Sequence, residues 1–224
     1  MKVALKSFWC QIPDFNPMAI LGFFVLADAL AWLLYGFYTQ DILTSRFFHI
    51  ARDRGFGEIV QYPKFGVMIA VLVRARRQWP SRLVNAWLIL FTVMLLDDAI
   101  GIHEAIGGWL LPEPSAHWRG LRLKDLAEAA AIAALEGGTF LYMAYCHFRE
   151  PPAKRVFSWW FIAGLVPVIF SGLVLDIVRV PMLEAAGEMI AMTILLAVVL
   201  WRYRVRRDAP PVPAPGAHAL PMTS

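Results

Sequence analysis

A run of apolar residues from Met18 to Tyr38 constrains this chain more than any other feature. It is 21 residues long and contains one charged residue, Asp28. A helix needs about 20 predominantly apolar residues to cross the hydrocarbon core of a bilayer. The run is too long for the core of a signal peptide. We therefore predict a first membrane-spanning helix over 18–38.

The rest of the chain predicts five more spanning helices, so the expected fold is an all-α integral membrane bundle of about six transmembrane helices. The predicted ranges are 57–73, 83–109, 125–148, 156–176 and 182–203. Together with the first helix they form one transmembrane domain, residues 1–207. Residues 208–224 are rich in Pro and Ala, a composition typical of a disordered tail.

The composition agrees with this prediction. Of the 224 residues, 59% are hydrophobic and 17% are charged, against about 25% charged in an ordinary soluble domain. A soluble protein of this size needs more polar surface, so we exclude a disordered chain, a nucleic-acid-binding domain and an ordinary cytosolic enzyme. The expected partners are membrane lipids and not nucleic acids, and the sequence predicts no particular protein partner.

The 21 Lys and Arg residues gather in short clusters between the apolar runs, the tightest at 74–82 and 202–207. Cytoplasmic loops carry such an excess of basic residues. With both termini in the cytoplasm, 13 basic residues fall on the inner side and 8 on the outer side, among them Lys64. We predict a multi-pass protein of a bacterial inner membrane, with cytoplasmic N- and C-termini.

Acidic residues inside the predicted helices are the candidate functional residues. From Leu83 to Asp97 the third helix rises about 21 Å, and from Trp201 back to Glu188 the sixth rises about 20 Å. The core of a bilayer is about 30 Å thick, so two separate helices deliver carboxylates to one level, nearer the outer face. The groups at this level are Asp97, Asp98, His103 and Glu104 on the third helix and Glu184 and Glu188 on the sixth.

The angular positions favour a common site inside the bundle. On a regular helix Asp97 and Glu104 lie about 20° apart, whereas His103 and Asp98 point about 100° or more away from them. A local break at Gly101 would let all four converge. Carboxylates that face lipid are costly, so these faces should point inward. Further intramembrane acids are Asp28, Glu128, Glu136 and Asp176.

Carboxylates and an imidazole at one level form the ligand set of a divalent metal ion. We therefore predict a metal-dependent membrane enzyme that acts on a lipid-like substrate, with a site open to the periplasm. The predicted metal ligands are Asp97, His103, Glu104, Glu184 and Glu188, and the predicted catalytic groups are Asp98, His103 and Glu104. A proton- or cation-coupled transporter that uses the same carboxylates is the alternative. A third possibility is an accessory subunit in which the acids only bond to one another or to nearby basic residues.

Two short segments carry a resemblance. Leu96-Asp97-Asp98 with His103-Glu104, together with Glu184 and Glu188-Met189 in the last helix, resembles a pattern of uncharacterised bacterial multi-pass membrane proteins. Those proteins carry an L-D-[DE]-x4-H-E segment and a late E-E-x-x-E-M segment. This chain has Ala185 where the second segment has its second Glu. The resemblance implies a multi-pass membrane protein and no established activity.

Overall fold

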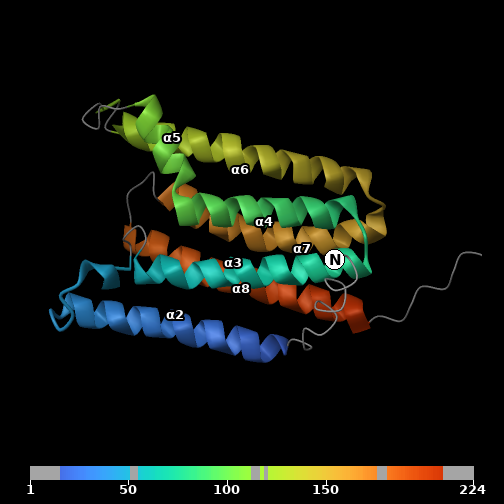
Figure 1. Ribbon diagram of the computed structural model, residues 1–224, viewed down its shortest axis with the longest axis horizontal. Helices are drawn as coiled ribbons and strands as arrows, with labels where there is room; N and C mark the ends of the chain where they lie inside the picture. Colours follow the sequence, from blue (N-terminus) through green and yellow to red (C-terminus); the bar gives the residue numbers. More distant parts are fainter. Residues whose placement is uncertain (1–15, 51–54, 112–116, 119–120, 176–180, 209–224) are drawn as a thin grey trace, which may run out of the picture.

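The computed structural model describes residues 16–50, 55–111, 117–118, 121–175 and 181–208. Within these residues, six helices are long and apolar enough to cross a membrane, which confirms that part of the predicted fold. They are α2 (Pro17–Thr39), α3 (Phe56–Gln78), α4 (Arg82–Ile100), α6 (Leu123–Arg149), α7 (Pro152–Ile169) and α8 (Pro181–Asp208). The six lie side by side, and each runs in the opposite direction to the one before it in the chain (Figure 1).

The smaller elements gather at one end of this bundle (Figure 1). They are the 3-10 helix η1 (Arg46–Phe48), the short helix α5 (Ile102–Leu110), the antiparallel strands β1 (His117–Trp118) and β2 (Leu121–Arg122), and the π-helical segment η2 (Phe170–Leu175). We call this end, where α3, α6 and α8 also begin, the α5 end. At the opposite end α2, α4 and α7 begin.

Local sequence explains where two of the helices begin. The side chain of Asn16 accepts hydrogen bonds from the backbone N–H groups of Met18 and Ala19, and Pro17 takes the first position of α2. Ser81 accepts from the N–H of Leu83 in the same way at the start of α4. Such caps satisfy N–H groups that have no partner within the helix.

Ser81 also ties α4 to the loop that precedes α7. Its hydroxyl donates to Oε1 of Glu150 over 2.8 Å, and Lys154 lies 3.4 Å from the other oxygen of that carboxylate. The hydrogen bond from Ser81 lowers the pKa of Glu150, because it stabilises the ionised carboxylate. This contact lies at the end of the bundle opposite α5.

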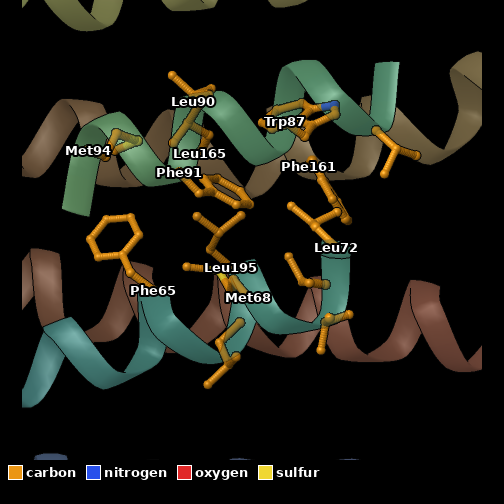
Figure 2. Close-up of a cluster of buried hydrophobic side chains, with 14 of the residues drawn as sticks. Phe65, Met68, Leu72, Trp87, Leu90, Phe91, Met94, Phe161, Leu165 and Leu195 are labelled. Carbon is orange, nitrogen blue, oxygen red and sulfur yellow. The ribbon is translucent and has the colours of Figure 1, made fainter. Parts of the chain in front are cut away.

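The centre of the molecule is an apolar core between α3, α4, α7 and α8 (Figure 2). Trp87, Phe91 and Phe161 are fully buried there, with Trp87 and Phe161 ring centroids 5.2 Å apart. The indole N–H of Trp87 donates to Ser158 over 2.9 Å, so its one polar group is satisfied. Large apolar side chains therefore pack closely through this part of the bundle.

Helix α2 contributes little to this core. It packs on α3 and α8, yet Phe24 and Ala31 are its only buried residues among those described. Its large apolar side chains are mostly exposed, as expected for a helix that faces lipid.

Two predicted helix ranges need correction. The predicted helix over 83–109 is two helices, because α4 ends at Ile100 and Gly101 has a left-handed backbone (φ 71°, ψ 47°) before α5 begins. The predicted helix over 156–176 begins earlier, at Pro152, and its last described residues form η2 in place of regular α-helix. The predicted tail lies outside the described residues, apart from Asp208 at the end of α8.

Candidate functional site

A cavity of about 440 Å³ opens within the α5 end of the bundle. Residues of α3, α4, α5, α6, α7, α8 and η2 line it, so it draws on most of the elements at that end. Nine carboxylates contribute to its wall, together with His103 and Lys124. The nine are Glu58, Asp97, Asp98, Glu104, Asp125, Glu128, Glu136, Glu184 and Glu188.

The cavity therefore brings together the six residues that the sequence predicts at one level. They lie on three helices, α4, α5 and α8: Asp97, Asp98, His103, Glu104, Glu184 and Glu188. It also includes Glu128 and Glu136 of the further intramembrane acids. Asp28 is not part of the wall, and Asp176 lies outside the described residues. Glu58 and Gln61 were missed, although their spacing with Phe65, three and then four residues apart, is that of one helix face.

The cavity wall contains apolar as well as acidic residues. Along α8 it runs from Glu184 to Met192, eight residues or roughly 12 Å of helix. Phe65, Met94 and Met192 line it and also belong to the apolar core of the bundle. The acidic groups therefore share the cavity with side chains of that core.

Asp97 and His103 form a pair that depends on the helix break. Asp97 is 1% exposed, and its Oδ1 accepts the backbone N–H of His103 over 2.9 Å. Its Oδ2 lies 3.0 Å from Nδ1 of the His103 ring. The left-handed turn at Gly101 makes this geometry possible, because it folds the first turn of α5 back over the last turn of α4.

The pair has a clear chemical consequence. An imidazole that donates from Nδ1 to a carboxylate keeps a lone pair on Nε2, and that nitrogen is then free to take a proton or bind a metal ion. The carboxylate that orients the ring also caps α5 through its other oxygen, so a structural role and a chemical role coexist in Asp97.

Basic residues at the α5 end offset part of the acidic charge. Lys124 lies 3.1 Å from Oε1 of Glu128, one helical turn away. This contact agrees with the structural alternative for Glu128. Three further basic residues lie near this end in the sequence, but their side chains are outside the part that the structure describes: Arg119, Arg122 and Arg179.

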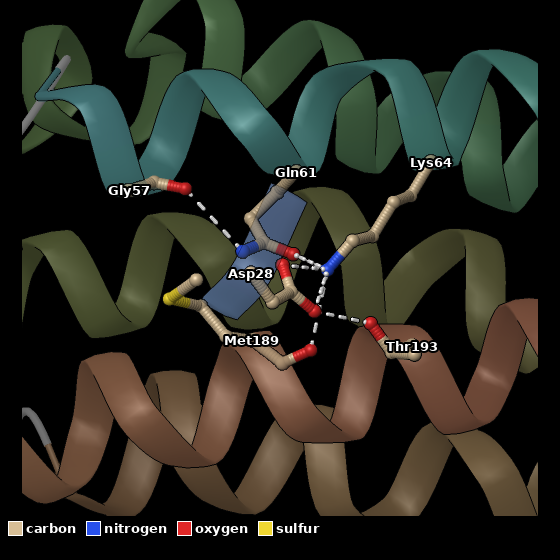
Figure 3. Close-up of polar contacts among 6 residues, drawn as sticks. All are labelled: Asp28, Gly57, Gln61, Lys64, Met189 and Thr193. Atoms are coloured by element: carbon tan, nitrogen blue, oxygen red, sulfur yellow. Dashed lines mark hydrogen bonds and ion pairs between the residues drawn. The ribbon is translucent and has the colours of Figure 1, made fainter. Parts of the chain in front are cut away.

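A second polar cluster joins α2, α3 and α8 (Figure 3). Lys64 of α3 is completely buried, and its Nζ lies 2.7 and 2.8 Å from the two carboxylate oxygens of Asp28 in α2. Nζ also donates to Oε1 of Gln61 and to the backbone oxygen of Met189 in α8. Thr193 donates to the Asp28 carboxylate over 2.6 Å.

Lys64 was counted with the basic residues on the outer side of the membrane, but this cluster buries it inside the bundle. Lys64 is the ninth residue of α3, so it lies two helical turns inside the bundle. Gln61 and Met189 line the cavity, which makes the cluster a support for two of its walls. The signal in the sequence was the polar spacing of Glu58, Gln61 and Lys64, each three residues apart on one side of the helix.

No group of three or more His, Cys, Asp or Glu side chains among the described residues is already arranged around one point as a metal site. The carboxylates line a shared space in which they repel one another. Bound cations or protons have to offset that repulsion in a low-dielectric site. The arrangement is therefore suited to binding a cation and to moving protons.

The resemblance based on the Leu96–Glu104 segment and the Glu184–Met189 segment stays a prediction. Comparison of the chain with protein-family models, with curated proteins and with solved structures found no match.

Proposed function

We propose that this protein is a multi-pass membrane enzyme whose acidic cavity binds a divalent cation and acts on a lipid-like substrate. The observation that carries the proposal is the Asp97–His103 pair on the wall of an acid-lined cavity that borders the apolar core. A carboxylate that orients an imidazole next to open space is the arrangement of a general base or a metal ligand.

The cation would take its ligands from His103, Glu104, Glu184 and Glu188. Asp97, the fifth predicted ligand, would join them only by releasing the His103 ring, because Nε2 points away from the carboxylate that holds Nδ1. Carboxylate oxygens and imidazole nitrogen suit Mn²⁺, iron and Zn²⁺, and carboxylates alone suit Mg²⁺ and Ca²⁺. All five residues line the same cavity, and Asp and Glu side chains can rotate toward a common ion. Asp98 is the proposed acid–base group, together with whichever of His103 and Glu104 does not bind the cation.

The size and position of the cavity favour a lipid-like substrate. A volume of 440 Å³ leaves room for a headgroup beside a metal ion, since one water takes about 30 Å³. Helix α5 carries His103 and Glu104 to the cavity and exposes Ile106, Trp109 and Leu110 on its outside. Exposed Trp next to aliphatic residues is typical of the membrane interface, where headgroups lie.

The proposed location is a bacterial inner membrane with both termini in the cytoplasm and the cavity open toward the periplasm. Arg76 and Arg77 close α3 at the end opposite the cavity, and Arg202 and Arg204 follow the apolar part of α8 at the same end. Positive charge at that end supports the cytoplasmic assignment.

A proton- or cation-coupled transporter is the second candidate, and the Asp28–Lys64 ion pair is the observation that favours it. The pair lies inside the membrane-spanning region and connects to the cavity through Gln61 and Met189. Charged groups within a membrane often belong to ion or proton pathways. The packed core beyond the cavity favours the enzyme.

The test of the metal is a thermal melt in detergent, with and without a chelator, of three proteins: wild type, Glu188→Gln and the control Glu150→Gln. Saturating metal stabilises a protein by about 2.7 kcal/mol when its concentration is 100 times Kd. We expect the chelator to lower the Tm of wild type and of Glu150→Gln but to leave Glu188→Gln unchanged. The metal site would be contradicted if the chelator left the Tm of wild type unchanged and Glu188→Gln were at least as stable as wild type.

Activity separates the two candidate functions. The enzyme predicts turnover of fluorescent phospholipids in mixed micelles, lost with chelator and with His103→Ala. The transporter predicts proton or Mn²⁺ flux in proteoliposomes and no turnover.

A further inference from the structure

The wall of the cavity formed by α8 and η2 contains an unusually close contact. Gly172 lies in the π-helical segment η2, and Glu188 lies on α8, and both line the cavity. A Cβ placed on Gly172 would lie 2.6 Å from Oε1 of Glu188. The carboxylate therefore occupies the space that any larger residue at position 172 would fill.

The backbone around Gly172 is held in place by its own sequence. Pro167 lacks a backbone N–H, and its carbonyl oxygen accepts the hydroxyl of Ser171 over 2.9 Å. The π-helical turn begins at Phe170, directly after this departure from a regular helix, and such turns occur frequently at functional sites. On the facing helix, a Cβ on Gly187 would collide with the Ser171 hydroxyl, so each of the two glycines leaves room for a polar side chain of the other segment.

A glycine in the preceding helix α7 shows what a packing glycine looks like. A Cβ on Gly164 would meet Cδ1 of Leu195 at 3.0 Å, which is an apolar contact within the core. Gly172 differs because the atom it accommodates is a carboxylate oxygen on the cavity wall. Its absent side chain makes room for a polar group and not for another helix.

We propose that Gly172 is a positioning residue for Glu188: the glycine in the π-helical turn seats the Glu188 carboxylate on the cavity wall, where it serves as a ligand of the cation. This inference rests on the proposed function. It adds that the shape of η2, and not only the carboxylates themselves, determines how well the cation binds.

The physical consequence separates this role from a packing role. The atom that meets a new methyl group at position 172 is the end of a flexible side chain, so Gly172→Ala displaces the carboxylate and leaves the helices in place. We therefore expect a small change in Tm and a large change in cation affinity. A packing glycine would show the opposite pattern.

The experiment measures Mn²⁺ binding, by electron paramagnetic resonance of the purified full chain, for wild type, Gly172→Ala and Gly138→Ala. Gly138 is the matched control, because it lies on α6 and a Cβ there meets nothing within 4 Å. We expect Gly172→Ala to weaken Mn²⁺ binding about 10- to 100-fold, the usual effect of losing a group that orients a ligand. Gly138→Ala should bind like wild type.

The double variant Gly172→Ala/Glu188→Asp provides a rescue. Aspartate is one methylene shorter, so its carboxylate clears the new methyl group. We expect Glu188→Asp to weaken binding when Gly172 is present and to restore part of the lost binding when it is combined with Gly172→Ala.

Some results would overturn the inference while the proposed function stands. One is a Gly172→Ala variant that binds Mn²⁺ with wild-type affinity. Another is a Gly172→Ala variant whose reduced Mn²⁺ affinity falls further when Glu188→Asp is added. A wild type that binds no Mn²⁺ would remove the proposed function, and this inference with it. A large loss of Tm in Gly172→Ala that the shorter aspartate does not relieve would identify Gly172 as a packing residue.

Discussion

At the scale of single residues, the burial of Lys64 carries a high energetic cost. Its ammonium is completely buried within a helix long and apolar enough to span a membrane. A charge in that position is tolerated only when it is paired and hydrogen-bonded. Asp28, Gln61 and the carbonyl of Met189 supply four contacts of 2.7 to 3.3 Å to its nitrogen.

Removing one partner of this pair should cost far more than removing both. Lys64→Met leaves Asp28 inside the bundle without its cation, and losing one half of a buried pair typically costs about 3–5 kcal/mol. The double variant Asp28→Leu/Lys64→Met leaves no charge behind and should be closer to wild type. Reversible unfolding in mixed detergent with increasing dodecyl sulfate measures both.

A Lys64→Met variant as stable as wild type would mean that the ion pair adds nothing to stability. A double variant less stable than either single variant would mean that polar contacts, including the one from Thr193, hold α2 in place by themselves.

At the scale of elements, the break between α4 and α5 shapes the candidate site. Gly101 is the one glycine with positive φ among the described residues. Its N–H still bonds to the carbonyl of Asp97 over 2.7 Å, so it ends α4 while α5 leaves in a new direction. A straight helix would have pointed His103 away from Asp97, whereas the break brings the two into contact.

Gly101→Ala should therefore damage both stability and the site. A left-handed backbone costs a residue with a side chain about 1–2 kcal/mol, and any relaxation toward a regular helix separates Asp97 from His103. Gly108→Ala is the matched control in α5, because a Cβ at position 108 meets nothing within 4 Å. Thermal melts should show a lower Tm for Gly101→Ala and an unchanged or higher Tm for Gly108→Ala.

The Mn²⁺ titration applied to the same two variants tests the site. We expect weaker binding in Gly101→Ala and wild-type binding in Gly108→Ala. Equal Tm and equal binding in both would show that the left-handed turn is not required.

At the scale of the whole molecule, the bundle has two unlike ends. One end contains the acidic cavity and the short helix α5, and the other contains the closing basic residues of α3 and α8. The apolar core lies between them. This polarity along the helix axes predicts a fixed orientation in the membrane.

A reporter that is active only in the periplasm tests that orientation. Fused after Ser224 it should be inactive, and inserted within 112–120 it should be active, because the excess of Lys and Arg retains the termini in the cytoplasm. Reversed activities would place the cavity on the cytoplasmic side and overturn the proposed orientation.

The sequence by itself determined the class of fold, because six apolar stretches of spanning length have few alternatives once composition excludes a soluble domain. It also indicated that Asp97 and Glu188 lie close together, because the rise of a helix converts residue counts into positions along the bundle. Both residues line one cavity. Both inferences need only the geometry of a single helix.

The tertiary structure alone decided the pairing of Lys64 with Asp28, the contact of Asp97 with His103 and the position of Glu188 over Gly172. Each depends on the position of a second segment of backbone. A count of basic residues near helix ends places Lys64 outside the membrane-spanning part of the chain. Only the packing of α2 against α3 and α8 brings the Asp28 carboxylate to it. The sequence suggested a break at Gly101, but only the structure shows that the left-handed turn there brings Asp97 and His103 into contact. The π-helical turn at Gly172 departs from the regular backbone that helical periodicity assumes.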